Sequence, residues 1–122
     1  MLVRKVLIAA YRDGQYGVKT ERLVNPTWKQ LEARIHELDR LFRPFLWFYT
    51  EPDAEDGDQP NFEIIGGNGV FAIQSRIDGN TWSYYDPSKG DKEVAVWESD
   101  QGASVPEKST CSDVQAVLRI TK

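Results

Sequence analysis

The stretch IIGGNGVF, residues 64–71, places three glycines and an asparagine between two groups of apolar residues. An Asn-Gly pair is the preferred centre of a type I′ turn, which joins two antiparallel strands through two residues. We therefore predict that Asn68-Gly69 is the turn of a β-hairpin. In that register Ile64 lies opposite Ile73.

A second turn signal, Asp78-Gly79, extends this hairpin into a three-stranded meander and places Ser75 opposite Trp82. Together the two turns gather apolar side chains on one face: Phe62, Ile64, Phe71, Ile73, Ile77, Trp82 and Tyr84. The other, outer face carries Glu63, Ile65, Ala72, Gln74, Arg76, Thr81, Ser83 and Tyr85. A slip by one residue would exchange the faces, so the agreement of two independent turns supports both.

A phosphate-binding loop is the alternative interpretation of these glycines. Such a loop follows a strand and opens a helix, so that backbone N–H groups point at the anion. Here the strand-like run VFAIQSRI, residues 70–77, follows instead, and neither GxGxxG nor a Walker lysine occurs. The pattern favours the hairpin.

The segment NPTWKQLEARIHELDRLFRP, residues 25–44, predicts the longer helix. Thr27 and Gln30 form a capping box at its start. Apolar residues recur at spacings of three and four along one side: Trp28, Leu31, Ile35, Leu38 and Phe42. Pro44 predicts an end around residues 39–42.

The rest of the chain completes an α+β fold in a single domain, residues 1–122. We expect a mostly antiparallel sheet, with hairpins and the meander, packed by the longer helix and a short C-terminal helix. Ser112 to Gln115 resembles a second capping box that opens the short helix. Further strands are predicted at residues 2–11, 17–24, 45–50 and 93–98, with a turn at 12–15 and loops at 51–60, 86–93 and 98–108. Strands and helices do not alternate along the chain, and this argues against a doubly wound nucleotide-binding fold.

Composition narrows the function. The net charge of -4 and the absence of a Lys/Arg cluster argue against direct nucleic-acid binding and suit a basic protein partner. The single cysteine excludes an intramolecular disulfide and fits a reducing cytosol. The apolar run at residues 6–10 is too short to cross a membrane. We expect a cytoplasmic protein without a membrane partner.

The acidic loop, EPDAEDGDQP at residues 51–60, is the main candidate for partner binding. Its acidic residues are Glu51, Asp53, Glu55, Asp56 and Asp58. Their spacing is not that of an EF-hand, and the later glutamate is missing, so we predict no metal. The alternatives are a solvated loop and a surface that meets a basic protein.

Two residues of the outer face, Arg76 and Tyr85, complete the candidate partner surface. Tyr85 is expected to be exposed, and tyrosine is a common interface anchor, although a partly covered sheet residue is the alternative.

Catalytic chemistry finds little support. His36 stands alone on the helix and is interpreted as a surface residue, and Cys111 as a small apolar residue near the second helix. No nucleophile, base and oxyanion donor assemble, so we predict no enzyme and no cofactor. A site made of carboxylates alone stays open.

The order of the motifs resembles the first-numbered family of immunity proteins from bacterial polymorphic-toxin and contact-dependent inhibition systems. The similarity lies in Asn-Pro-Thr-Trp at residues 25–28, hydrophobic-Gly-Gly-x-Gly at 65–69 and Asp-Pro at 86–87. It covers roughly residues 22–120. Of the family's Gly-Gly-Gln-x-Gly stretch, this chain keeps only Gln101 and Gly102. The family's last helix is also usually longer.

The resemblance implies a cytoplasmic antidote that binds the C-terminal domain of a cognate toxin, often a nucleic-acid deaminase or nuclease. It implies no catalytic residue, and no contact residue can be carried over. Two other functions remain open: a small enzyme or ligand-binding domain with an apolar pocket at the sheet, and an interaction domain of a housekeeping complex. The oligomeric state is not determined by the sequence.

Overall fold

The computed structural model describes residues 3–12, 15–41, 43–51, 53–55, 58–77, 79–98 and 103–121, with the backbone alone for 7–12, 15–19 and 77. Its main sheet has six antiparallel strands in the order β2-β1-β3-β4-β5-β6. Their bounds are β1 Lys5–Arg12, β2 Gln15–Val24, β3 Phe45–Tyr49, β4 Phe62–Gly67, β5 Val70–Ile77 and β6 Asn80–Ser83. The other elements are α1 Trp28–His36, β7 Glu93–Trp97, β8 Ala103–Pro106, the 3₁₀ turn η1 Glu107–Ser109 and α2 Val114–Thr121. This confirms the α+β class.

The β4–β5 hairpin has the predicted register. Ile64 pairs with Ile73, and the turn residues Asn68 and Gly69 have φ angles of 50° and 81°, as a type I′ turn requires. Ser75 pairs with Trp82 in the next hairpin, as predicted. Of its two turn residues, Asp78 lies outside the described residues. Both local turn signals therefore determine the strand pairing.

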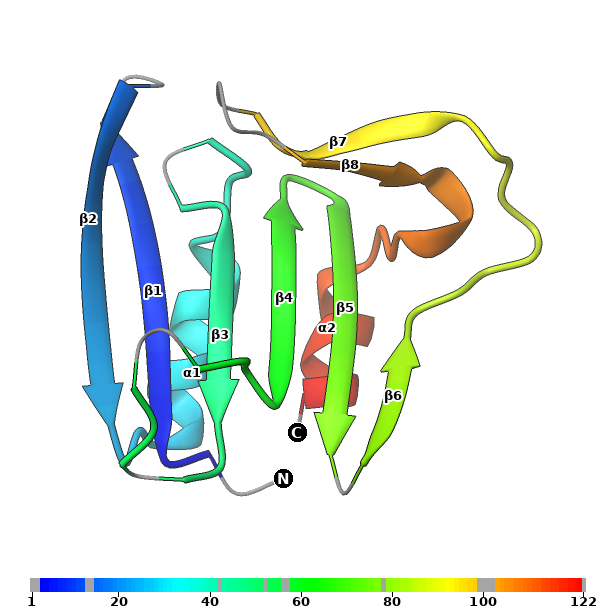
Figure 1. Cartoon of the computed structure of the whole chain (residues 1–122). Coiled ribbons are helices and arrows are strands. Elements are labelled where there is room, and N and C mark those ends of the chain that lie inside the picture. The colour runs from blue at the N-terminus through cyan, green and yellow to red at the C-terminus, as the bar shows by residue number, and fades with distance from the viewer. Residues whose placement is uncertain are drawn as a thin grey trace.

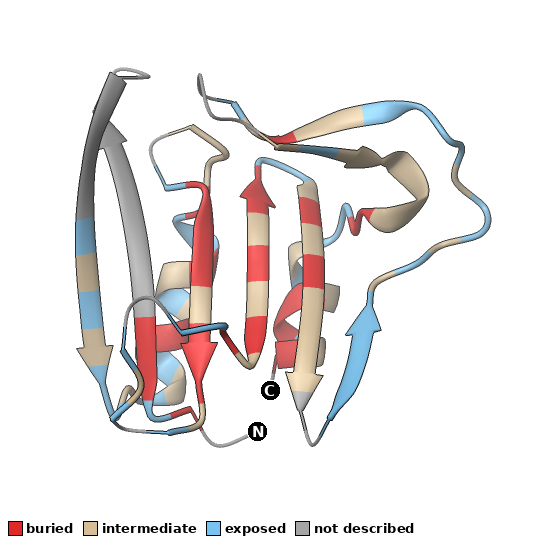
Figure 2. Ribbon diagram, viewed as in Figure 1, coloured by how far each residue is buried: buried red, intermediate tan, exposed pale blue. Residues whose placement is uncertain are grey.

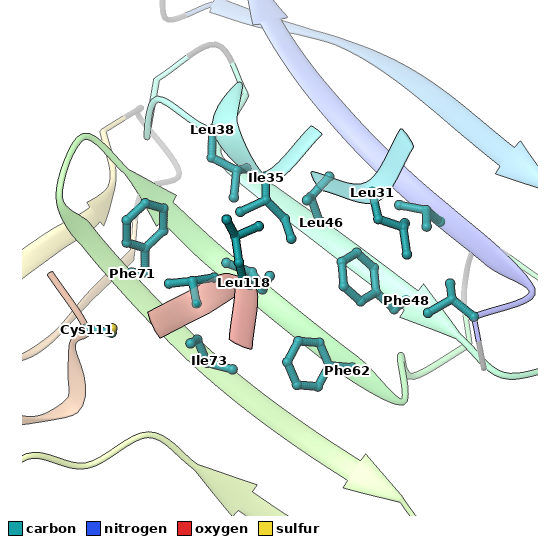
Figure 3. Close-up of a cluster of buried hydrophobic side chains, with 14 residues drawn as sticks. Leu31, Ile35, Leu38, Leu46, Phe48, Phe62, Phe71, Ile73, Cys111 and Leu118 are labelled. Carbon is teal, nitrogen blue, oxygen red and sulfur yellow. The ribbon is translucent and has the colours of Figure 1, made fainter. Parts of the chain in front are cut away.

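Both helices lie behind the sheet in the view of Figure 1 and cover one face. Figure 3 shows the core that results, in which Ile35 of α1 and Leu118 of α2 point toward the strands. The buried residues of this core are Val3, Val6, Leu31, Ile35, Leu38, Leu46, Phe48, Phe62, Ile64, Phe71, Ile73, Cys111, Val117 and Leu118. Phe48 and Phe62 stack here, with ring centroids 5.5 Å apart.

The predicted apolar face is covered only in part. β6 is exposed along its length, as Figure 2 shows, and Trp82 on it is 46% exposed. Tyr84 packs partly buried against the core. The side chain of Ile77 lies outside the described residues. The alternation of side chains between the two faces was therefore predicted correctly. The extent to which the helices cover the sheet was not predicted.

α1 begins as predicted and ends earlier. The Gln30 N–H donates to Thr27 Oγ1 at 3.2 Å, and the Thr27 N–H donates to Gln30 Oε1 at 2.9 Å. The predicted end at residues 39–42 is wrong, because the helix stops at His36. Asp39 forms a bridge with Gly67, and its carboxylate accepts from the backbone N–H groups of Leu41 and Arg43. These contacts hold the chain in a turn; Phe42 lies outside the described residues.

Two predictions near the C-terminus are corrected. The segment 98–108 was predicted as loop but contains β8, which pairs with β7, and the start of η1. Pro106 ends β8, a position where a strand tolerates the missing N–H. The helix α2 is capped by Asp113 and not by Ser112, because the Gln115 N–H donates to Asp113 Oδ1 at 2.9 Å. The Ser112 hydroxyl lies 3.0 Å from Lys89 Nζ instead.

A second, smaller cluster lies on the face of the sheet opposite the helices. Phe45 is its buried centre, and Trp47, Ile65 and Trp97 pack around it. The ring centroid of Phe45 lies 4.7 Å from that of Trp47, in a stacked arrangement. It lies 5.8 Å from the ring centroid of Trp97, in a T-shaped arrangement. Trp97 ends β7, so this cluster attaches the β7–β8 hairpin to the outer face.

Candidate functional site

The acidic loop joins β3 to β4 and exposes its described carboxylates. Glu51, Asp53, Glu55 and Asp58 are all exposed, whereas Asp56 lies outside the described residues. Asp58 shapes the loop locally, because its carboxylate accepts from the Glu55 N–H at 2.8 Å and its own N–H donates to the Glu55 carbonyl at 3.0 Å. These two hydrogen bonds hold Glu55 and Asp58 together.

Two buried side chains attach this loop to the sheet. Lys5 Nζ donates to the Ala54 carbonyl at 2.6 Å, and the Tyr49 hydroxyl donates to the Asp58 carbonyl at 3.1 Å. Lys5 and Tyr49 pair across β1 and β3, and the ammonium lies 5.6 Å from the centre of the ring. Burial, and then the charges of Asp58 and Glu63, raise the pKa of the Tyr49 hydroxyl. Both anchors donate to backbone carbonyls of the loop.

Asn61 fixes the point where the loop enters β4. Its Oδ1 accepts from the Thr50 N–H at 3.0 Å, and its carbonyl accepts from the Arg76 N–H at 2.7 Å. The base of the loop is therefore tied to β3 and β5 together.

The remaining predicted partner residues differ in their distance from the loop, because the Arg76 N–H donates to the carbonyl of Asn61 at the base of the loop, whereas Tyr85 lies elsewhere. Arg76 is half-buried on the outer face of β5, where its Nη2 donates to Gln74 Oε1 at 2.6 Å. Tyr85 is 59% exposed, as expected, but it follows β6 at the far edge of the sheet. The loop lies beside β1 and β3, as Figure 1 shows, so Tyr85 does not share a surface with it.

A cavity of about 240 Å³ lies between the outer side of β4–β5 and the β7–β8 hairpin. Its walls are largely apolar, with Ile65 and Ala72 from the sheet and Val96, Ala103 and Val105 from the hairpin. Besides Ser83, the residues Glu63 and Gln74 contribute polar groups from the sheet. The sequence placed both residues on the outer face but did not single them out.

Glu63 is the perturbed carboxyl group of this cavity. Burial raises its pKa, while the charge of Arg76 and the indole N–H of Trp47 act in the opposite direction. Trp47 pairs with Glu63 across β3 and β4, although its buried Nε1 completes no close hydrogen bond among the described residues. A signal was present in the sequence, since Glu63 interrupts the apolar run from Phe62 to Ile65.

The other candidate chemical groups lie as expected. His36 is exposed and borders a second hollow, also of about 240 Å³, with Asn68 and Ser112. Cys111 is buried where its backbone pairs with Phe71. Among the described residues, no three His, Cys, Asp or Glu side chains gather as a metal site would need. In the same part of the chain, every helix is too short or too polar to span a bilayer.

The fold and the site define an α+β protein with helices on one face, and a cavity and an anchored acidic loop on the other. Comparison with protein-family models, with curated proteins and with solved structures gives no match.

Proposed function

We propose that this chain is an immunity protein that binds and neutralises a cognate toxin domain acting on nucleic acid, such as a deaminase or a nuclease. Support comes from the order of the motifs at residues 25–28, 65–69 and 86–87, which resembles the immunity family. The proposal places the protein in the cytoplasm, where such a toxin meets its substrate. It describes a binding protein and not an enzyme.

The observation that carries the proposal is the anchored acidic loop. The described part of its backbone is already held by Lys5, Tyr49 and Asn61, so binding would cost little further ordering of those residues. An enzyme that acts on nucleic acid has a basic substrate groove. An acidic surface attracts such a groove and accelerates association.

The first test identifies the partner. If the neighbouring reading frame encodes a large effector, the C-terminal domain of that effector is the candidate toxin. A pull-down from the native host followed by mass spectrometry identifies the partner without that assumption. The expected result is a one-to-one complex that abolishes the toxin's activity. Absence of a complex with any toxin domain of the host would overturn the proposal.

The second test places the loop in the interface. The triple variant Glu51→Gln, Asp53→Asn and Glu55→Gln removes exposed charge and leaves Asp58, which folds the loop. We expect its association rate constant to fall by about tenfold or more at low salt and to vary less with ionic strength. Glu93→Gln, an exposed carboxylate on β7, is the control and should change the rate little. An unchanged rate in the triple variant would exclude the loop from the interface.

The cavity supports a second candidate, a ligand-binding domain with a pocket at the sheet. Its volume of about 240 Å³ and apolar walls suit a small molecule, and Glu63 supplies a polar contact. Ligand pockets combine these features, an apolar lining with a few placed polar groups. Binding of small probes to this cavity would separate the second candidate from a protein that acts through its surface alone.

A further inference from the structure

The orientation of the Gln74 side chain follows from its contact with Arg76. A guanidinium has hydrogen-bond donors only, so the carboxamide atom of Gln74 that lies 2.6 Å from Arg76 Nη2 is the acceptor Oε1 and not Nε2. The Nε2 group is therefore the end of Gln74 that can donate to another molecule.

Glu63 is the cross-strand neighbour of Gln74. It pairs with Gln74 across β4 and β5, and both side chains line the cavity. The Cβ atoms of directly opposite residues lie about 4.5–5.5 Å apart in antiparallel strands. The cavity therefore presents an acceptor and a donor next to each other on one wall.

The size of the cavity limits what can bind there. An apolar cavity of about 150 Å³ holds one benzene molecule, and pockets for drug-sized ligands begin at about 300 Å³. At about 240 Å³ this cavity has room for a single ring with a polar edge.

We propose that the cavity binds a small cyclic amide. The ring packs against Ile65, Ala72 and Val105, its N–H donates to the Glu63 carboxylate, and its carbonyl oxygen accepts from the Gln74 carboxamide. This inference rests on the ligand-binding candidate and is independent of toxin binding. It deepens that candidate by naming the chemical class of the ligand.

The test compares three probes of similar size on the unaltered chain of residues 1–122. Backbone amide NMR shifts are followed during titration with 2-pyridone, which has the N–H beside the carbonyl, with N-methyl-2-pyridone, which lacks the donor, and with benzene. We expect 2-pyridone to shift the amides of Ile65, Ala72 and Val105, and the other two to bind at least about tenfold more weakly.

A variant tests the donor separately. Gln74→Glu keeps an oxygen for Arg76 but replaces the donor by an acceptor, so 2-pyridone affinity should fall at least about tenfold. Gln115→Glu makes the same change of charge at an exposed position on α2, across the sheet, and should leave the affinity unchanged.

The outcomes separate the inference from the candidate on which it rests. Equal binding of benzene and 2-pyridone would keep a ligand-binding cavity but overturn the cyclic amide. Shifts confined to residues away from the cavity would also overturn it. If no probe binds, both the inference and the ligand-binding candidate fail.

Discussion

Lys5 Nζ donates to the carbonyl oxygen of Ala54 across 2.6 Å, so a lysine only 8% exposed holds the acidic loop against the sheet. The contact joins β1 to the loop after β3, two segments 49 residues apart in sequence. A buried ammonium is tolerated there because it has a carbonyl to donate to and lies near the ring of Tyr49.

Replacing Lys5 by methionine tests this anchor, because Lys5→Met keeps an apolar stem and removes the donor. The half-covered Ala54 carbonyl loses a charged donor, so the free energy of unfolding should fall by about 1–3 kcal/mol. The Ala54 and Asp58 amides should exchange hydrogen faster. Lys29→Met, at an exposed site on α1, is the control and should lie within about 0.5 kcal/mol of the unaltered protein. Equal effects of the two changes would contradict the anchor.

Glycine at position 67 is required by both conformation and space. Its φ is +140°, and a Cβ there would collide with the main chain of Leu38 and Asp39. We expect Gly67→Ala to lower the free energy of unfolding by about 3 kcal/mol or more, because backbone must move. Urea titration measures the loss.

Two other glycines allow the cost of an unfavourable backbone conformation to be measured separately from the cost of a steric collision. Gly79 has a φ of +77° and nothing within 4 Å of the point where a Cβ would stand, and Gly90 has open space and no such φ. Gly79→Ala should cost about 1 kcal/mol through conformation alone, and Gly90→Ala about 0.5 kcal/mol or less. A Gly67→Ala variant no less stable than Gly79→Ala would show that the α1–β3 turn adapts freely.

The raised pKa of Glu63 predicts a pH dependence of stability. As pH rises from the ordinary carboxyl pKa to the folded value, the unfolded chain ionises while folded Glu63 keeps its proton, so stability falls across that window and then levels off. Glu63→Gln removes this term. The variant should therefore gain stability relative to the unaltered protein as pH rises through the window.

Urea unfolding at a series of pH values from about 4 to 8 measures this difference, and each unit of pKa shift corresponds to about 1.4 kcal/mol before solvent screening of this half-buried group. Glu93→Gln on β7 should give a flat difference. A flat difference for Glu63→Gln as well would show that Arg76 and Trp47 offset the effect of burial.

Two neighbouring residues, Ser112 and Asp113, differ in whether they cap α2. Asp113→Ala removes the acceptor of the Gln115 N–H and should cost about 1 kcal/mol. Ser112→Ala removes only an exposed contact with Lys89 and should cost less. Thermal unfolding of the two variants measures the order, and the reverse order would restore Ser112 as the cap.

Local chemistry in the sequence was sufficient for much of the fold. Asn68-Gly69 specified the type I′ turn, and with it the pairing of Ile64 and Ile73, because few residue pairs accept a positive φ at both positions. Thr27 and Gln30 likewise specified the start of α1, since the capping box involves only neighbouring residues. The exposure of the acidic loop followed from its charge.

Contacts between distant segments decided the rest. The end of α1 depends on Asp39 meeting Gly67, and the exposure of Trp82 depends on where the helices stop covering the sheet. β8 exists as a strand through its pairing with β7. Short polar segments such as these carry weak local preferences, so tertiary partners determine their conformation.

The sequence by itself determined the turns, the strand register and the alternation of the two faces, because each depends on residues close together in the chain. Only the tertiary structure decided what each face meets. It brought the β7–β8 hairpin over Glu63 and Gln74, which turned two ordinary outer-face residues into the polar wall of a cavity. The burial of these residues depends on neighbours from other elements, and no local pattern encodes it.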